Sequence, residues 1–454
     1  MISVKNERII TSWDTINPDG DAEKKMLSVI LDRSRLLKKK RWIWPAVAGL
    51  AIIAIIGFVM FMRGNRVSAS NLMEGISPNE DIENVGSNEY VPMIADFAVR
   101  LLKESFIEGE NQLLSPASVI LAMGMTSNGA NGETLRQMEA VLGAQVDTLN
   151  GYLHSYEDEL AEGSVYYKVS IANSIWYNEN FKNVNREFLQ KNADYYNAEL
   201  YQRKFDNGAV KEINKWAEKK TDGMIPELLN SIPHDNMMYL INALCFDAEW
   251  VNVYRDINVK EGDFTKEDGT KQKAQFMCST EYQFIEDDYA TGFIKPYKGK
   301  KYAFVALLPN QGVSIADYID SLDASRFTEM IANVSLEYEV SAKLPKFSLD
   351  YSINLKDVLK KMGIRDAFDI NQADFSNMAA PLDEPLFISG VLHKTFIQVD
   401  EKGTKAGAIT KVDASEAAFP REIKEVFLDR PFIYMIIDID SNVPLFIGTM
   451  MEIP

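Results

Sequence analysis

The stretch that decides the fold is residues 386–415, LFISGVLHKTFIQVDEKGTKAGAITKVDAS. Its first part, Leu386–Val399, predicts a strand, and Val426–Ile437 predicts another. About two dozen residues without helical periodicity connect the two. Loops of this length in a compact body are usually functional or disordered, so the connector is a candidate functional segment.

The first part of this connector has the pattern of a half-buried strand. Every second residue is small or apolar and none is charged: Thr404, Ala406, Ala408, Thr410, Val412 and Ala414. The alternate positions are mostly polar: Lys405, Gly407, Ile409, Lys411, Asp413 and Ser415. Two interpretations remain open on this pattern. The segment is either a loop that can become a strand, or an ordinary edge strand that follows Glu401–Gly403.

The rest of the body predicts an α+β fold. Apolar spacing predicts helices around Ile94–Leu102, after Ser115-Pro116, and over Thr134–Leu142. Continuous apolar runs predict buried strands, and these are Tyr302–Leu308, Phe432–Ile437 and Leu445–Met450. Helices dominate the first half and strands the second, with no βαβ alternation, which disfavours a doubly wound α/β fold.

Composition excludes several function classes. The chain has 454 residues, 46% of them hydrophobic and 25% charged, which is typical of globular proteins. Residues 1–41 carry ten Lys or Arg against six Asp or Glu, whereas residues 63–454 carry 38 against 60. A body with a net charge of −22 repels phosphate backbones, so we expect no nucleic-acid partner.

Catalytic and metal-binding motifs are absent from the sequence. It has no GxSxG, HExxH, Walker A, GxGxxG or CxxC motif, so we expect no enzyme and no cofactor. Three separated histidines, His154, His234 and His393, disfavour a metal site, and we expect each to be structural. Cys245 lies in an apolar run and predicts a buried thiol, although a disulfide with Cys278 stays open.

A membrane span is the clearest feature of the N-terminal region. Trp42–Met62 is 21 residues long without a charge, enough to cross a hydrocarbon core of about 30 Å. Six Lys or Arg between Arg33 and Arg41 precede it, and only Arg63 and Arg66 follow closely. The positive-inside rule therefore predicts a cell-membrane protein with a cytoplasmic N-terminus and an exported body. A cleaved secretory signal ending near Val67–Ala69 is the alternative.

This span divides the chain into four parts. Residues 1–41 form a cytoplasmic tail, in which Asp21–Leu37 is a candidate amphipathic helix for a partner or a lipid surface. Residues 42–62 form the anchor, and the acidic residues 63–88 predict a linker. Residues 89–454 form the globular domain, with its functional loop at about 401–426.

Residues 89–454 resemble the serpin family of protease inhibitors. The matching motifs keep the family's order along the whole domain. They are NQLLSPAS (111–118), GMTSNGANGETLRQM (124–138), Asn242-Ala243 with Trp250, LPKFSLDYSINLKDVLKKMGIRDAF (344–368), ADFSNM (373–378), ISGVLHKTFIQVDEKGTKAGAIT (388–410), DRPFIYMI (429–436) and PLFIGTM (444–450).

This resemblance implies a fold and a mechanism. The fold has three β-sheets and eight or nine helices, and it holds an exposed reactive loop. A target protease cleaves the loop and forms an acyl-enzyme, and the loop then inserts into the central sheet and distorts the protease. The hinge that inserts first is Glu401, Gly403, Thr404, Ala406, Ala408 and Thr410. Its inward positions carry no charge, as burial in a packed sheet requires.

The resemblance also assigns other residues. Ser115, Ser118, Asn242 and His393, together with Trp250, match the cluster that controls opening of the sheet. Family inhibitors usually have Glu at Lys405 and Ala at Gly407, and both positions belong to the outward-facing set. The family's usual intervals from Glu401 and from Pro431 both place the scissile bond at Ala417–Ala418. A shifted register would place it at Glu416 or Phe419.

The expected function is suicide inhibition of serine, and in some cases cysteine, endopeptidases outside the cell. A small residue at Ala417 fits elastase-like or subtilisin-like targets. Few cysteines and a single sequon, Asn333-Val334-Ser335, favour a bacterial source, and we expect a monomer. Two other functions stay open. One is a non-inhibitory serpin that acts as an extracellular binding or scaffold protein, and the other is a receptor that signals loop cleavage through residues 1–41.

Overall fold

The computed structural model describes residues 69–454 except 80–81, 83–84, 87–89, 182, 380–384 and 405–420. Within these ranges no helix is both long and apolar enough to cross a bilayer. The expected span Trp42–Met62 and the cytoplasmic tail lie outside the described residues, as does the loop from Lys405 to Pro420.

Three sheets organise the described residues, as the family resemblance implies. The large sheet has seven strands in the order β1-β4-β3-β5-β14-β13-β12. Their bounds are β1 Ser70–Asn71, β3 Tyr167–Asn178, β4 Glu199–Arg203, β5 Met238–Glu249, β12 Phe347–Asn354, β13 Ile388–Val399 and β14 Gly403–Thr404.

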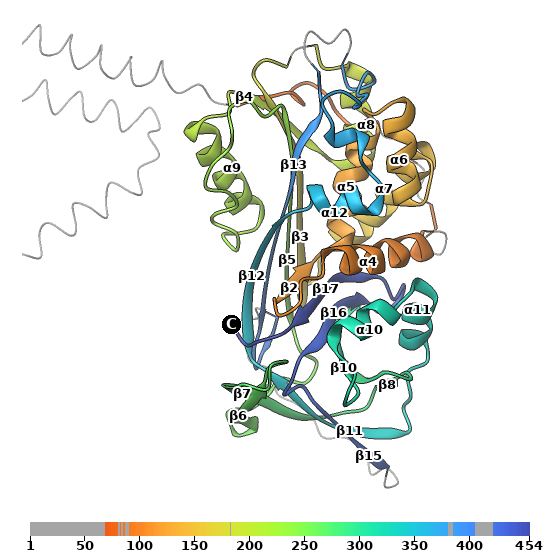
Figure 1. Cartoon of the computed structure of the whole chain (residues 1–454), viewed down its shortest axis with the longest axis vertical. Coiled ribbons are helices and arrows are strands. Elements are labelled where there is room, and N and C mark those ends of the chain that lie inside the picture. The colour runs from red at the N-terminus through yellow and green to blue at the C-terminus, as the bar shows by residue number, and fades with distance from the viewer. Residues whose placement is uncertain are drawn as a thin grey trace, which may run out of the picture. The chain divides into compact units, whose positions relative to one another are not determined.

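The other two sheets lie beyond one end of the large sheet's helical layer (Figure 1). The middle sheet has the order β2-β17-β16-β10-β9-β8, and the small sheet has the order β15-β11-β7-β6. The middle sheet consists of β2 Gln112–Leu114, β8 Phe284–Glu286, β9 Ala290–Pro296, β10 Tyr302–Pro309, β16 Phe432–Asp438 and β17 Pro444–Met450. The small sheet consists of β6 Val259–Thr265, β7 Lys271–Glu281, β11 Tyr338–Pro345 and β15 Glu422–Phe427.

Nine α-helices occur in the described part of the chain, which agrees with the expected number. They are α4 Val91–Ser105, α5 Pro116–Ser127, α6 Gly132–Leu142, α7 Val146–Ala161, α8 Arg186–Tyr196, α9 Asn207–Lys220, α10 Ile315–Ser321, α11 Ala324–Ala332 and α12 Lys356–Met362. Two short 3₁₀ turns are η2 Asp256–Asn258 and η3 Asp366–Phe368. The three predicted helices correspond to α4, α5 and α6, and the three predicted buried strands to β10, β16 and β17.

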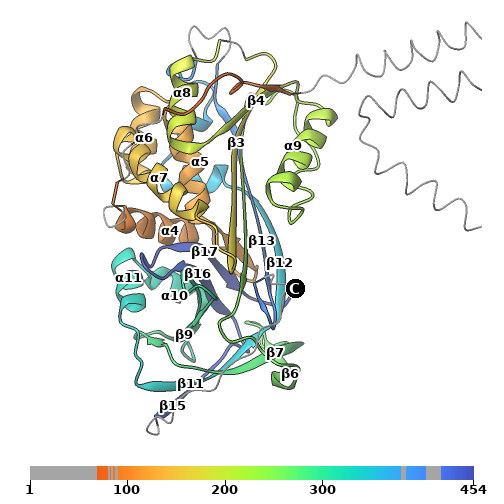
Figure 2. The same ribbon diagram turned by 180° about the vertical axis from the view of Figure 1, so that it is seen from behind.

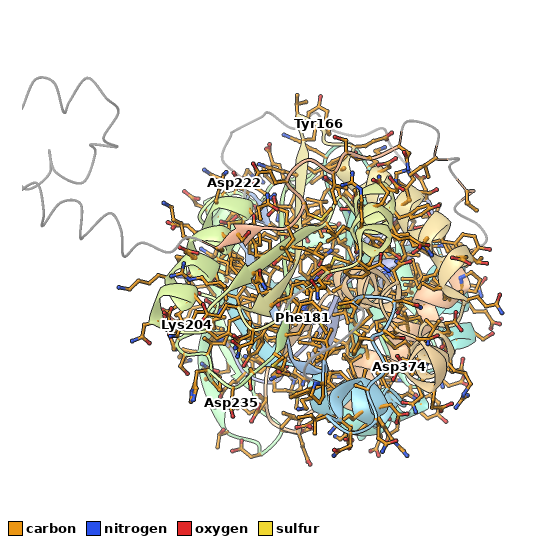
Figure 3. The ribbon with its side chains drawn as sticks, turned by 90° about the horizontal axis from the view of Figure 1, so that it is seen from above. Tyr166, Phe181, Lys204, Asp222, Asp235 and Asp374 are labelled. Atoms are coloured by element: carbon orange, nitrogen blue, oxygen red, sulfur yellow. The ribbon has the colours of Figure 1, made fainter. Side chains whose placement is uncertain are left out.

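Helices cover the large sheet on both faces. Helices α4 to α8 lie on one face, and of the helices in the described residues α9 lies on the other (Figures 1 and 2). Every residue of α5 is buried, since this helix packs between the sheet and its neighbouring helices. Seen from above, Lys204 and Asp222 lie on the side of α9, and Asp374 lies on the opposite side (Figure 3).

The centre of the large sheet is the pair β5 and β13. These strands run parallel over most of their length, with Asn242 opposite His393 and Cys245 opposite Phe396. At one end β14 separates them, antiparallel to both, with Thr404 opposite Ala248 of β5 and Val399 of β13. The large sheet is therefore closed along most of the β5–β13 pair and has a short extra strand at one end.

One strand prediction was wrong. Val426–Ile437, expected as one strand region, contains parts of β15 and β16, which belong to different sheets. Between them the chain turns, because Pro431 has no N–H to donate and the N–H groups of Leu428 and Asp429 bond to Lys343 and Phe427 carbonyls.

The segment before the domain contacts the large sheet. Residues 69–79 fall within the expected linker, and in this segment β1 pairs with the edge strand β4. The N–H of Ala69 donates to Glu212 Oε2 of α9 at 2.8 Å. Cys245 lies on β5 and Cys278 on β7, in different sheets, and both are thiols.

Candidate functional site at the β5–β13 pair and the loop hinge

A buried polar cluster joins β5, β13 and α5. The backbone N–H of Ser115 donates to His393 Nε2 at 3.0 Å, and His393 Nδ1 lies 2.6 Å from Asn242 Oδ1. Because Nε2 accepts, Nδ1 carries the proton and donates to the Asn242 amide oxygen. Asn242 Nδ2 in turn donates to the carbonyl of Ser118 at 2.7 Å. Four of the expected sheet-opening residues are therefore in one hydrogen-bonded group.

This cluster is electrically neutral. Burial lowers the pKa of His393 to about 3, so the imidazole carries no charge at neutral pH. Ser115, Ser118, Asn242 and His393 are all inaccessible to solvent. Within the described residues the Ser118 hydroxyl has no hydrogen-bond partner, which leaves the cluster with spare bonding capacity. Neutral groups can exchange partners when the strands part without exposing or burying a charge.

One further residue, Asn173, bonds to this cluster, and Thr395 makes a separate buried hydrogen bond on the strand that carries His393; neither was predicted. Asn173 on β3 accepts from Asn242 Nδ2 at 2.5 Å, and the hydroxyl of Thr395 on β13 donates to the carbonyl of Leu113 at 2.7 Å. Thr395 lies two positions after His393, so the alternation of a strand places both side chains on one face. That spacing is a sequence signal that could have identified Thr395. No such spacing in the sequence points to Asn173.

Trp250, which we grouped with this cluster, lies elsewhere. It follows the end of β5, eight residues after Asn242, which is about 26 Å along an extended strand. There it is fully buried and stacks on Tyr297 with ring centroids 4.3 Å apart. Its indole Nε1 donates to the Asp400 carbonyl at 2.9 Å. Trp250 therefore contacts the hinge and not the polar cluster.

The hinge begins with a tight turn at Asp400–Gly403. The N–H of Asp400 donates to the Gly403 carbonyl at 3.0 Å, and the Asp400 carboxylate accepts from the N–H of Lys402 at 2.8 Å. Outside the turn, the N–H groups of Trp250 and Tyr254 donate to the Lys402 and Glu401 carbonyls, both at 2.8 Å. Three successive carbonyls of the hinge are thus bound by the segment after β5.

The expected hinge residues that the structure describes have distinct environments. Glu401 lies 2.7 Å from Lys346 Nζ. Partial burial is the largest single effect and opposes ionisation of Glu401. The hydrogen bond from Lys346, a backbone hydrogen bond and the nearby charges of Lys346 and Lys402 together outweigh it, so the pKa of the carboxyl is lowered. Thr404 is fully buried, and its Oγ1 lies 2.6 Å from the Tyr297 hydroxyl. Ala406, Ala408, Thr410 and the bond Ala417–Ala418 lie outside the described residues.

Gly403 is required by a close approach of two chains. A Cβ at this position would lie 2.0 Å from the carbonyl oxygen of Ala248 and 2.8 Å from the Cα of Glu249. Both are backbone atoms of the neighbouring strand β5 and its end, so they cannot move aside as a side chain would. Only glycine allows β14 to pair with β5 at this point.

The two residues of β14 lie at one end of the directly paired strands β5 and β13. A strand that continues beyond Thr404 would have to enter between β5 and β13, replacing their direct pairing along the polar cluster. The described residues contain no group of three or more His, Cys, Asp or Glu side chains able to hold a metal ion.

Comparisons with known proteins agree with this geometry. A family model described as Serpin (serine protease inhibitor) matches residues 92–453. Neuroserpin from Homo sapiens is 30% identical over 383 residues, covering 79% of this chain and 90% of neuroserpin. Iris from Ixodes ricinus is 31% identical over 378 residues, covering 79% of this chain and 98% of Iris.

Solved structures give the same result. The native state of the thermophilic serpin Tengpin is 44% identical, with a TM-score of 0.81 over 85% of this chain and 100% of the Tengpin chain. The latent state of the same serpin gives a TM-score of 0.73 over 82% of this chain and 100% of that one. The described fold therefore agrees better with the native state than with the latent state.

Proposed function

The chain belongs to the serpin family, and we propose on this premise that it inhibits serine endopeptidases as a suicide substrate. The observation that carries the proposal is β14. Gly403 and Thr404 are already paired between the ends of β5 and β13, at the position where an inserted loop would start. The chain that follows has the alternating small residues that a buried strand needs.

The proposed reaction begins at Ala417–Ala418. The protease serine attacks the carbonyl carbon of Ala417, the peptide bond breaks, and the new amine of Ala418 takes the proton. Ala417 then remains bound to the protease as an ester. Insertion of residues 405 onward between β5 and β13 carries the bound protease away before water hydrolyses this ester.

Insertion is energetically feasible because it buries no charge. The inward positions Ala406, Ala408 and Thr410 are small and uncharged, whereas Lys405 and Lys411 belong to the outward set. The strand that enters between β5 and β13 would pass His393 and Asn242, which form a neutral pair. Their hydrogen bonds can be exchanged for bonds to the incoming strand. The lost β5–β13 ladder is replaced by two new ladders, so backbone hydrogen bonding increases.

The target class follows from the residue at the cleaved bond. A methyl side chain at Ala417 fits a shallow apolar specificity pocket, as in elastase-like and subtilisin-like proteases. Cleavage after Glu416 or Phe419 would instead indicate a Glu-specific or a chymotrypsin-like target.

We also propose that the domain is displayed outside a bacterial cell. The support is the uncharged run Trp42–Met62, with the basic cluster Arg33–Arg41 before it. In this arrangement the inhibitor protects the cell envelope or neighbouring proteins from proteases.

The test of inhibition uses the full chain in detergent micelles. Mixed with a pancreatic-type elastase and, separately, with a subtilisin, it should form a complex that survives SDS and release a fragment that begins at Ala418. Cleavage in the loop by elastase, subtilisin and chymotrypsin classes with no stable complex from any of them would contradict the proposal.

A further inference from the structure

A buried ion pair lies between the middle and small sheets. Lys295 on β9 and Glu281 at the end of β7 have side chains only 2% and 7% exposed. Lys295 Nζ lies 2.7 Å from Glu281 Oε1. Removing two charges from water is costly, and the attraction of one carboxylate rarely compensates for it alone. Other contacts must therefore help to stabilise the buried Lys295 ammonium.

Two aromatic rings face the same ammonium. Lys295 Nζ lies 4.5 Å from the ring centroid of Tyr254 and 5.5 Å from that of Trp250. Ser279 Oγ lies 2.6 Å from Glu281 Oε1 and 3.3 Å from the Tyr254 hydroxyl. Lys295, Glu281, Trp250 and Tyr254 form one connected group, called the cation platform below. A desolvated cation over ring faces is a strong contact of this type.

The two aromatic residues of the cation platform, Trp250 and Tyr254, also contact the loop hinge. The Trp250 indole Nε1 donates to the Asp400 carbonyl, whereas the backbone N–H groups of Trp250 and Tyr254 donate to the Lys402 and Glu401 carbonyls. The Trp250 ring also stacks on Tyr297, whose hydroxyl binds Thr404. Two of the residues that bind the turn Asp400–Gly403, Trp250 and Tyr254, therefore also have their rings against the Lys295 ammonium.

We propose that Lys295 is a positioning residue for loop insertion. Its buried ammonium holds Trp250 and Tyr254 in place, and these hold the hinge turn so that β14 is aligned between β5 and β13 before the loop is cut. An aligned start removes part of the ordering entropy that insertion would otherwise cost. Insertion then competes better with hydrolysis of the ester. This inference rests on the proposed inhibitory function.

The test measures the partition ratio, which is the number of cleaved molecules per trapped protease. The main variant is the double change Lys295→Met with Glu281→Leu, since apolar replacement of both partners of a buried pair preserves folding in other proteins. We expect its partition ratio to rise about tenfold, a factor that corresponds to one lost contact of this strength. The rate of initial attack on the loop should stay unchanged, because the cleaved bond lies far along the chain from the hinge.

Two comparisons isolate the cation. Lys295→Arg keeps the charge and should keep the partition ratio of the unaltered chain. Arg326→Met is the matched control, because Arg326 also pairs with a carboxylate, Asp287 at 3.1 Å, and lies over a ring, Tyr289 at 4.5 Å. Within the described residues none of the contacts of Arg326 reaches the hinge. The partition ratio of the Arg326→Met variant should therefore equal that of the unaltered chain.

Three results would overturn the inference: an unchanged ratio in the double variant, an equal rise in Arg326→Met, or an initial attack that slows by the same factor. If the unaltered chain traps no protease, inhibition itself fails and a second measurement decides the inference. The heat-stable form should then appear about tenfold more slowly after loop cleavage in the double variant than in Arg326→Met. Equal rates would overturn the inference.

Discussion

The hydroxyl of Tyr297 on β9 lies 2.6 Å from Oγ1 of Thr404, the last described residue before the loop. Thr404 is completely buried, so the first residue of the proposed inserted strand already occupies an interior position. Replacing it by a charged side chain should therefore oppose both the existing pairing of β14 and the insertion of the strand that follows it. Burying an unpaired guanidinium costs several kcal/mol, which favours a loop that stays outside the sheet.

Thr404→Arg should convert the inhibitor into a substrate. We expect cleavage of the loop at an unchanged rate and at least a tenfold loss of SDS-stable complex, measured on denaturing gels. Thr404→Ser retains the hydroxyl that faces Tyr297 and should behave as the unaltered chain does. A Thr404→Arg variant that still traps protease stoichiometrically would show that Thr404 need not enter the sheet.

Gly403→Ala should displace β14. The added Cβ would lie 2.0 Å from the Ala248 carbonyl oxygen, so the pairing of Gly403 and Thr404 with β5 cannot form. We expect faster hydrogen exchange at the amides of this strand and slower insertion after cleavage. Gly86→Ala is the control, since a Cβ there meets no atom within 4 Å. Unchanged exchange in Gly403→Ala would contradict the pairing described here.

His393 should make stability depend on pH in the acid range. Burial lowers its pKa to about 3, whereas in an unfolded chain it is about 6.5. The unfolded state binds the extra proton between these values. The contribution of His393 to the free energy of unfolding is therefore complete above pH 6.5 and falls as the pH drops toward 3. His393→Gln should lose this slope, at most about 1.4 kcal/mol per pH unit, in urea unfolding. An identical slope in both chains would exclude His393 as its source.

Glu157 on α7 should have the opposite effect from His393, so that its contribution to the free energy of unfolding falls as the pH rises. Burial, and to a smaller extent the neighbouring Asp158, raises its pKa to about 8. The contribution of Glu157 to the free energy of unfolding is complete below about pH 4.3, the pKa of Glu in an unfolded chain. It is lost as the pH rises toward 8. Glu157→Gln should therefore gain stability relative to the unaltered chain above pH 8, measured by urea unfolding. Curves that stay parallel from pH 5 to pH 9 would show that the carboxyl ionises normally.

Local patterns predicted much of the fold. The helices α4, α5 and α6 and the buried strands β10, β16 and β17 lie where apolar periodicity placed them. The division between β15 and β16 was missed because Val426 and Phe432 are both buried, and burial alone does not show that two strands belong to different sheets. Pro431 was the available signal for that boundary.

The site was less accessible to sequence reasoning. Family resemblance supplied Ser115, Asn242 and His393, which meet although they come from three separate segments. It also led us to group Trp250 with them. Trp250 instead lies after the end of β5, at the hinge, several residues along the strand from Asn242. Lys295 and Glu281 could not be found this way, because a buried ion pair has no periodic signature and its partners lie in different sheets.

The central claim is that the cut loop becomes a strand between β5 and β13. The melting temperature of the full chain in micelles, before and after complete cleavage within the loop, tests this most directly. Each kcal/mol shifts the melting temperature of so large a domain by roughly 1–2 °C, so an added central strand should raise it by about 10 °C or more. A cleaved chain that melts at or below the temperature of the intact chain would contradict insertion.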